Sequence, residues 1–342
     1  MGPHPAVAEV RRAVRRCVVD GAEFRGPVLV ACSGGSDSLA LAAALAFEAP
    51  RAGLMAGLLT IDHGLQEGSA AQAARVAELG GELGLDPVRV VRVEVAGAGG
   101  PEASARRARY AALDRLAGPL EAVVLLGHTL DDQAETVLLG LGRGSGANSI
   151  AGMRAVDGRY RRPLLGLRRA TTRAACAALG LVGWDDPHNT DSRFRRVRIR
   201  QELLPLFEDV LAGGVAEALA RTAALLREDQ DGLAALAAAA LDRLTAAAPP
   251  AGLPVAELGE LPAALRSRVL KAWAERAGAA PLSAGHVATV GELVTAWHGQ
   301  GPIPLPGGFT VVRTSGTLWV SPVRSVGKSC ASNAAGNPAD TA

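Results

Sequence analysis

The chain has 342 residues, a net charge of +2 and 49% hydrophobic residues, of which few are aromatic. This length corresponds to two or three domains of ordinary size, and the composition allows a sizeable core of Ala, Leu and Val. The four cysteines have no C-x-x-C spacing, which argues against a zinc site and a redox dithiol. We therefore expect separate, reduced thiols, as in a cytoplasmic protein.

The N-terminal segment lacks the apolar stretch of a signal peptide, and its arginines fit the polar face of a helix within residues 1–24. The candidate membrane span at residues 28–47 contains Asp37 and a Gly-Gly break. A buried strand, turn and helix explain this stretch better than a membrane-spanning helix does. The sequence therefore predicts no contact with a membrane and a cytoplasmic location.

Strand-like and helical patterns alternate over the next part of the chain. The expected strands cover residues 27–32, 54–62, 88–95 and 121–128. The expected helices cover residues 38–49, 70–83, 102–117 and 130–142. This alternation predicts an α/β domain over residues 25–210 with a doubly wound, parallel sheet. The first and fourth strands are continuous apolar runs, as expected when helices cover both faces of a sheet.

After about residue 208 the sequence becomes rich in Ala and Leu and helical in pattern. We expect a helical linker over residues 211–245 and a mainly helical C-terminal domain over residues 246–324. A hairpin is expected within residues 305–320, where two strand patterns flank a Ser-Gly turn. Residues 325–342 are small and polar and are expected to form a disordered tail.

Three polar clusters follow strands of the predicted sheet: SGGSDS (33–38), IDHGLQ (61–66) and GHTLDDQ (127–133). In folds of this kind, ligands bind beyond the carboxyl ends of the strands. Because all three clusters lie at such ends, the sequence predicts a binding site at this edge of the sheet.

The SGGSDS cluster links the first strand to the helix that follows it. Gly34 and Gly35 allow a close approach of the backbone, and the unpaired N–H groups of a helix start attract an anion. The loop also carries the hydroxyl donors Ser33, Ser36 and Ser38. Asp37 would repel a phosphate unless a magnesium ion bridges them. The loop therefore predicts a pyrophosphate cradle; the alternative is that Ser36 or Asp37 only caps the helix.

The GHTLDDQAET stretch carries a second polar cluster. Thr129 and Asp132 can form a capping box at the start of its helix, which is a purely structural interpretation. Asp131 and Glu135 are four residues apart and so share a helix face. These acids therefore form a dense cluster at the end of the fourth strand, and we favour a functional role for it.

The sequence S-G-G-x-D-S after a first strand resembles the signature of the PP-loop ATP pyrophosphatases. Five other motifs resemble those of the tRNA(Ile)-lysidine synthetases within that family, and they occur in the same order. They are IDHGLQ (61–66), EASARRARY (102–110), LLGHTLDDQAETVLLGLGRGSG (125–146), RRPLL (161–165) and DDPHNTDSRFRRVRIRQELLP (185–205). The resemblance covers roughly residues 25–210, and the later region resembles the family's helical tRNA-binding part.

The resemblance implies a five-stranded, adenine nucleotide alpha hydrolase-like fold that uses ATP and magnesium. It implies that the wobble cytidine of tRNA(Ile) with a CAU anticodon is adenylated at the oxygen on carbon 2, with release of pyrophosphate. The ε-amino group of free L-lysine then attacks this carbon and expels AMP. The product, lysidine, changes codon reading from AUG to AUA.

The resemblance also implies roles for individual residues. It places nucleotide contacts on the SGGSDS loop and on Asp62, His63, Gly127 and His128. It implies catalytic roles for Asp37, as the metal ligand, and for His128, Asp132 and Glu135. A carboxylate of this cluster can hold the lysine ammonium and then accept its proton. For Asp62 a turn cap is the alternative, and for His128 an ordinary strand-end histidine.

Residues 154–200 carry twelve arginines against four aspartates, a net charge of +8, without lysine or glutamate. Arginine forks suit phosphates, so this block predicts contact with a polyanion, although solvation of an ordinary surface is the alternative. The expected tRNA contacts are Arg106, Arg109, Arg195, Arg198 and Arg200.

Two other classes of function stay open at this point. Another PP-loop enzyme that modifies tRNA or forms an amide would share the loop, but a thiolase would need paired cysteines, which are absent from the sequence. A non-catalytic module that binds nucleotide or RNA would be expected to lack Asp37 or the acidic cluster. The sequence leaves the oligomeric state open, a homodimer included.

Overall fold

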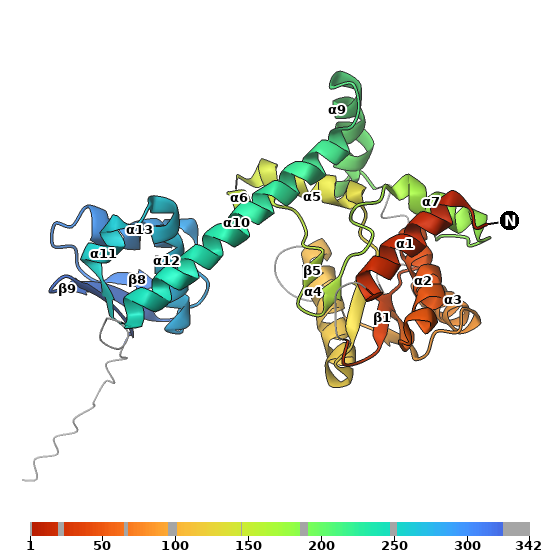
Figure 1. The fold of residues 1–342 in the computed structure, drawn as a ribbon, viewed down its shortest axis with the longest axis horizontal. Coiled ribbons are helices and arrows are strands. Elements are labelled where there is room, and N and C mark those ends of the chain that lie inside the picture. Colours follow the sequence, from red (N-terminus) through yellow and green to blue (C-terminus); the bar gives the residue numbers. More distant parts are fainter. Residues whose placement is uncertain are drawn as a thin grey trace, which may run out of the picture. The chain divides into compact units, whose positions relative to one another are not determined.

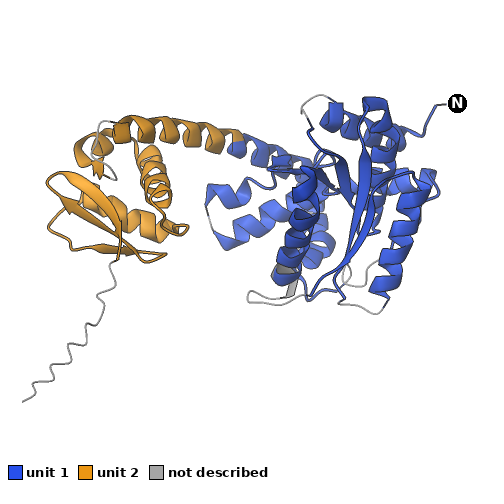
Figure 2. Cartoon of the chain, turned by 90° about the horizontal axis from the view of Figure 1, so that it is seen from below, with its two compact units in different colours: residues 1–227 blue, residues 228–342 orange. Residues whose placement is uncertain are grey.

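The computed structural model describes residues 2–19, 24–64, 68–94, 101–144, 146–184, 191–246 and 252–323 (Figure 1). The chain divides into two compact units, residues 1–227 and residues 228–342 (Figure 2). The division falls within the long helix α10, Val215–Ala246.

The first unit is built on a six-stranded sheet with the order β3-β2-β1-β4-β6-β5. Its strands are β1 Val28–Ala31, β2 Ala56–Asp62, β3 Val88–Arg92, β4 Val123–Leu126, β5 Val156–Asp157 and β6 Tyr160–Arg161. The first five in this order are parallel, which confirms the predicted doubly wound, parallel sheet, although the sheet has six strands and not the five that the resemblance implied. Strand β5 adds an antiparallel edge that was not predicted, because two residues are too few for a periodic signal.

The helices of this unit follow the prediction as far as α5 and then depart from it. They are α1 Pro5–Val19, α2 Ser36–Glu48, α3 Ser69–Glu82, α4 Pro101–Ala117, α5 Leu130–Arg143, α6 Ala147–Ile150, α7 Arg169–Ala178, α8 Arg195–Arg198, α9 Leu204–Val210 and the start of α10. The described residues of this unit also form the 3₁₀ turns η1 Pro50–Ala52 and η2 Gly118–Leu120 and the π-helical turn η4 Ile199–Leu203. Helices α6 to α9 are short, with 4 to 10 residues each, and the sequence analysis did not predict them.

The two central strands place the polar loops next to each other. Val28 and Val30 of β1 lie in the core formed with α1 and α2, whereas Leu29 lies in the core formed with Leu113 of α4. Successive residues of a strand face opposite sides, so both faces of the sheet are buried. Because β1 and β4 pair up to their last residues, the loops that follow them begin side by side.

The described part of the second unit combines a small sheet with the end of α10 and three shorter helices. The sheet has the order β7-β10-β9-β8 with antiparallel pairs, formed by β7 Gly252–Pro254, β8 Ile303–Leu305, β9 Phe309–Thr314 and β10 Thr317–Pro322. The shorter helices are α11 Val255–Glu260, α12 Ala263–Arg276 and α13 Ala284–Thr295. Strands β9 and β10 confirm the predicted hairpin. The predicted tail at residues 325–342 lies outside the described residues.

Two further observations concern the whole chain. No helix in the described ranges is both long and apolar enough to cross a membrane. Three cysteines, Cys17, Cys32 and Cys176, are free thiols, and Cys330 lies outside the described residues.

The contact between α5 and α6 provides a test of this fold. A Cβ added at Gly140 would lie 2.1 Å from the carbonyl oxygen of Ser149, whereas one at Gly142 would meet nothing within 4 Å. Gly140→Ala should therefore lower the free energy of unfolding by about 1–3 kcal/mol, because the backbone of α6 must move. The control Gly142→Ala should leave it unchanged or slightly higher. Urea unfolding measures both, and equal stabilities would contradict this packing.

Candidate functional site

The SGGSDS loop turns sharply between β1 and α2. Gly34 has φ +87°, in the left-handed region that favours glycine. The buried Ser38 hydroxyl donates to the carbonyl oxygen of Gly35 at 2.9 Å and accepts the backbone N–H of Ser33 at 3.2 Å. Ser38 therefore holds the loop together from inside, whereas the sequence analysis expected its hydroxyl to face a ligand. Ser33 is exposed and Ser36 half-buried.

The start of α2 has the features of an anion site. Its N-cap is Gly35, and no described side chain caps the helix, so the predicted alternative of capping by Ser36 or Asp37 is not what the structure contains. The first-turn N–H groups thus keep their capacity to bind an anion. A Cβ at Gly127 would lie 3.2 Å from the carbonyl oxygen of Asp37, so this glycine lets the β4 loop approach α2 closely.

The loop after β2 is organised by the buried Asp62. Its Oδ1 accepts the backbone N–H of Gly64 at 2.9 Å. Burial raises the pKa of Asp62, but hydrogen bonds from Gly64 and Ser69 and the charge of Arg92 outweigh burial, so the pKa is lowered. These contacts support the turn-forming interpretation of Asp62. A nucleotide contact by Asp62 and His63 stays a prediction.

The predicted capping box at the start of α5 is confirmed. The backbone N–H of Thr129 donates to Oδ2 of Asp132 at 2.8 Å, and Oγ1 of Thr129 accepts the N–H of Asp132 at 3.4 Å. The box leaves the other oxygen of Asp132, Oδ1, available for a partner. The structural and functional interpretations of this motif are therefore compatible.

Arg169, the first residue of α7, lies among the carboxylates that the sequence analysis singled out. Its Nη2 lies 2.6 Å from Oδ1 of Asp132, and its Nε lies 3.3 Å from Oδ2 of Asp37. Both Nη atoms lie 3.4 Å from Oε1 of Glu135. Burial lowers the pKa of Arg169, but these carboxylates outweigh burial and raise it. One guanidinium thus joins the SGGSDS loop to Asp132 and Glu135 of α5.

Glu135 is 0% exposed and has a second arginine partner. Arg200, in the turn η4, places Nε 2.7 Å from Oε1 and Nη2 3.2 Å from Oε2 of Glu135. The guanidinium of Arg200 therefore faces the acidic cluster, whereas the sequence analysis expected it to contact tRNA. Arg195 and Arg198 of α8 are exposed, and Arg198 pairs with Glu202 at 2.7 Å.

The carboxylate of Asp37 is partly buried and lies next to the hydroxyl oxygen of Thr172. Burial raises its pKa, and the Thr172 hydroxyl, which donates to Oδ1, and the Arg169 charge oppose this rise only in part. A carboxylate, a hydroxyl and phosphate oxygens are the donors that magnesium prefers, so this position fits that ion chemically. No group of three or more His, Cys, Asp or Glu side chains in the described part of the chain could hold a metal alone.

His128, at the end of β4, is neutral. Burial, the largest cause, together with the charges of Arg109, Arg162 and Arg106 outweighs the opposing charge of Asp132 and lowers the pKa of His128 to about 3. Its Nδ1 is buried without a hydrogen-bond partner among the described residues. His128 can therefore donate or accept a hydrogen bond, but it does not supply a positive charge at neutral pH.

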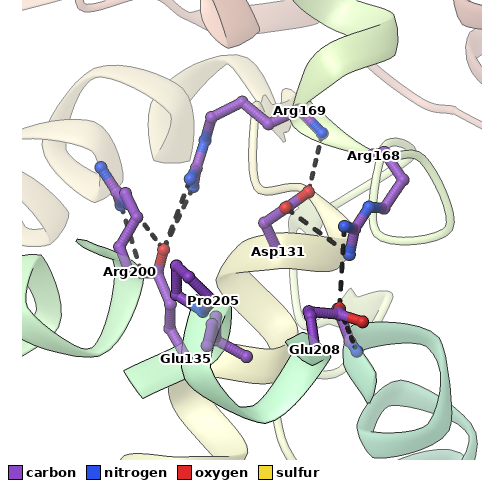
Figure 3. A pocket seen from close by; sticks show the side chains of 9 residues that line it. Asp131, Glu135, Arg168, Arg169, Arg200, Pro205 and Glu208 are labelled. Carbon is purple, nitrogen blue, oxygen red and sulfur yellow. Dashed lines mark hydrogen bonds and ion pairs between the residues drawn. The ribbon is translucent and has the colours of Figure 1, made fainter. Parts of the chain in front are cut away.

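A cavity of about 170 Å³ opens beside the acidic cluster (Figure 3). Figure 3 shows Arg169 and Arg200 converging on Glu135, and Arg168 between Asp131 and Glu208. The cavity is lined by Asp131, Glu135, Arg168, Arg169, Arg200 and Glu208 and by Leu204, Pro205 and Ala216. Charges of both signs and an apolar wall thus meet in one small space.

Sequence reasoning did not assign Arg168, Arg169, Thr172 or Glu208. Arg168 and Arg169 belong to the arginine-rich block, so their charge was noticed, but nothing local tells which carboxylate each one meets. Thr172 reaches Asp37 across 135 positions of sequence. Glu208 is an unremarked acid that accepts the N–H of Val215 at 3.0 Å and so holds the start of α10.

Comparison with known proteins agrees with this geometry and first defines a class. Residues 8–207 match the family described as "PP-loop domain". The U34-tRNA thiolase NcsA from Methanococcus maripaludis, solved with its [4Fe-4S] cluster, superposes with a TM-score of 0.55 at 18% identity. The match covers 65% of this chain and 80% of the thiolase, and it shows a shared fold. The chain is thus a PP-loop protein.

Closer relatives define the family. Residues 253–319 match the "TilS substrate binding domain". The tRNA(Ile)-lysidine synthase of Salinispora tropica is 53% identical over 322 residues, covering 92% of this chain and 96% of the relative. That of Thermobifida fusca is 53% identical over 323 residues, covering 94% and 99%. The chain belongs to the tRNA(Ile)-lysidine synthase family, which confirms the resemblance seen in the motifs.

The shared guanidinium of Arg169 leads to a prediction about stability. Arg169→Ala leaves three neighbouring carboxylates without this cation and should lower the free energy of unfolding at pH 7 by about 3–5 kcal/mol. The control Arg198→Ala breaks only an exposed ion pair and should cost less than about 1 kcal/mol. Urea unfolding of both variants measures the difference.

The stability difference between wild type and Arg169→Ala should depend on pH, and the lowered pKa of Asp132 gives the direction. Burial raises the pKa of Asp132, but Arg169 and the Thr129 bonds outweigh burial and hold it below its usual range. The stabilisation that the ionised Asp132 contributes is fully present above the ordinary carboxyl pKa. It is lost as the pH falls through the lower pKa that Asp132 has in the folded state. The gap between wild type and Arg169→Ala should therefore shrink below about pH 4. A gap that is constant with pH would show that Arg169 acts by packing alone.

Proposed function

We propose that the protein is a carbon–nitrogen ligase that joins L-lysine to carbon 2 of the wobble cytidine of tRNA(Ile) with a CAU anticodon, at the expense of ATP. The observation that carries the proposal is the contact of one guanidinium, that of Arg169, with Asp37, Asp132 and Glu135. It makes the SGGSDS loop and the acidic cluster a single site. A substrate of this kind places the enzyme in the cytoplasm.

The first half of the reaction is supported by the uncapped start of α2. Its N–H groups and the turn at Gly34 suit the outer phosphates of ATP. Magnesium, held by Asp37 with Thr172 beside it, would neutralise charge on these phosphates. The cytidine oxygen on carbon 2 attacks the α-phosphorus, the bond to the β-phosphate oxygen breaks, and pyrophosphate leaves. The neutral His128 can orient the reacting groups without attracting the phosphates away from the loop.

The second half is supported by the cavity beside Glu135. Its volume of about 170 Å³ suits one amino acid. Arg168 can meet the α-carboxylate of lysine, and Asp131 or Glu208 can meet its α-ammonium group. The side chain then points its ε-amino group toward Asp132, loses a proton there and attacks carbon 2, and AMP leaves with the former carbon 2 oxygen.

Glu135 and Asp132 of α5 then have different tasks. Glu135 is saturated by Arg169 and Arg200 and has no exposed surface, so we assign it to holding these arginines. Asp132 has one oxygen fixed in the capping box and one facing Arg169, so we assign it to the lysine ammonium. Burial raises the pKa of the Cys32 and Cys176 thiols, and neither is suited to the alternative of sulfur transfer.

An assay of product formation tests the function directly. With ATP, magnesium, labelled lysine and a CAU-anticodon tRNA(Ile) transcript, the protein should release AMP and pyrophosphate and fix lysine in the RNA. A methionine tRNA transcript, which shares the CAU anticodon, is the matched control and should take up little lysine. Turnover of ATP with lysine incorporated into no tRNA would reject the proposal.

A charge-removing variant tests the metal role of Asp37. Asp37→Asn keeps the shape of the side chain and its oxygen toward Thr172, but it removes the charge that magnesium requires. Pyrophosphate release should fall by at least about 10³-fold, as expected when a metal-held phosphate clamp is lost. Filter binding of tRNA should stay within about twofold, since none of the arginines expected to contact tRNA is among the hydrogen-bond and ion-pair partners of Asp37. Unchanged turnover of this variant would refute the metal role.

A further inference from the structure

Three arginines gather around the side chain of Tyr110 in α4. The Nη2 atoms of Arg106 and Arg162 donate to its hydroxyl oxygen at 3.3 and 3.4 Å. The Cζ atom of Arg109 lies 5.6 Å from the centre of its ring. The ring itself is held edge-on by Tyr160, with ring centroids 4.9 Å apart. The phenol thus fixes guanidinium groups from two distant segments in one place.

These arginines carry more positive charge than their neighbours neutralise. Arg162 is 4% exposed, and its Nη1 donates to the carbonyl oxygen of Arg154 at 2.7 Å. Its nearest carboxylate, that of Asp157, lies 3.7 Å from Nη2 and is largely exposed. The Nε atoms of Arg162 and Arg109 are buried, and within the described ranges neither has a hydrogen-bond partner. Buried donors without a partner are costly unless a ligand accepts their bonds.

The lowered pKa values of Arg109 and His128 are consistent with the same excess of positive charge. Burial is the main cause that lowers the pKa of Arg109, and Arg106 and Arg196 lower it further. Another buried polar atom without a hydrogen-bond partner among the described residues, Nδ1 of His128, belongs to a residue whose pKa is lowered by the charges of the same arginines. A ligand with several acceptor oxygens would satisfy these donors.

We propose that Arg109 and Arg162, held by Tyr110 and with the exposed Arg106 beside them, form a second phosphate site, distinct from the SGGSDS loop. It binds a backbone phosphate of the RNA next to the nucleotide that reacts. The proposal rests on the proposed function, because it names the part of the RNA substrate that this arginine cluster accepts. Arginine forks that present several N–H donors are well suited to phosphate oxygens.

The position of the site favours RNA over the nucleotide as the source of the phosphate. Helix α4 packs on the face of the sheet opposite α2, so Arg106 and Arg109 are carried by a helix on the other side of β1 from the helix that the SGGSDS loop begins. Exposure rises from the buried Arg162 through the half-buried Arg109 to the exposed Arg106, so the outer part of this arginine cluster is accessible to a large ligand. A nucleotide inserted from an RNA chain brings a phosphate on each side, and these need neutralising charges.

Binding of an anticodon stem-loop RNA tests the site without requiring the reaction. Arg162→Gln should weaken binding about tenfold and reduce the slope of log K against log salt by about one, as for the loss of one phosphate contact. The affinity for ATP with magnesium should stay within about twofold. Tyr110→Phe should weaken RNA binding less, since it removes only the hydroxyl that holds the arginines. The control Arg75→Gln, an exposed position on α3, should change neither affinity.

The decisive experiment uses an RNA in which one phosphate flanking the wobble cytidine is replaced by a neutral methylphosphonate. This RNA should bind wild type about tenfold more weakly, whereas Arg162→Gln should bind modified and unmodified RNA nearly equally. If Arg162→Gln does not fold by circular dichroism, the half-buried Arg109→Gln takes its place in the same cycle. Two results would overturn the proposal. In the first, the losses of affinity from Arg162→Gln and from the methylphosphonate are additive at both flanking phosphates. In the second, the variant loses ATP affinity while its RNA binding is unchanged. If the cycle shows coupling between Arg162 and an RNA phosphate but no lysidine forms, the phosphate site is supported and only the proposed function is rejected.

Discussion

The contact of the Arg169 guanidinium with Asp37, Asp132 and Glu135 is the constraint on which the rest of the site depends. Three carboxylates this close together repel one another, and burial disfavours their charged forms. The cation of Arg169 offsets this repulsion. Burial raises the pKa of Asp132, but Arg169 and the Thr129 bonds together outweigh burial and lower that pKa. Because this cation comes from the start of α7, it also fixes that helix over the edge of the sheet.

The backbone below this cluster sets where the carboxylates can lie. Strands β1 and β4 pair to their ends and are buried on both faces, so the loops after them begin at one level. Gly127 then allows the β4 loop to approach the first turn of α2, where a side chain would meet the backbone of Asp37. The capping box at Thr129 orients Asp132 within this arrangement. The packing of the apolar strands thus determines where the charged side chains of the site lie.

Much of this arrangement could be predicted from the sequence, because its signals are local. The apolar runs at β1 and β4, the glycine turn at Gly34 and the spacing of Thr129 and Asp132 act over a few residues each. The partners of Arg169 and Arg200 could not be predicted, since each meets carboxylates from 34 to 132 positions away. Ser38 differs, because its hydroxyl turns inward to the carbonyl oxygen of Gly35, a local contact, although its type and position suit a phosphate donor as well. Residue type identified the cluster, and tertiary structure decided which member binds which.

A structure of the protein with a non-hydrolysable ATP analogue, magnesium and lysine tests the central claim most directly. The account predicts the outer phosphates on the N–H groups at the start of α2, the ion at Asp37 and the lysine ε-nitrogen next to Asp132. Phosphates bound away from residues 33–38, or lysine bound outside the cavity next to Glu135, would contradict it.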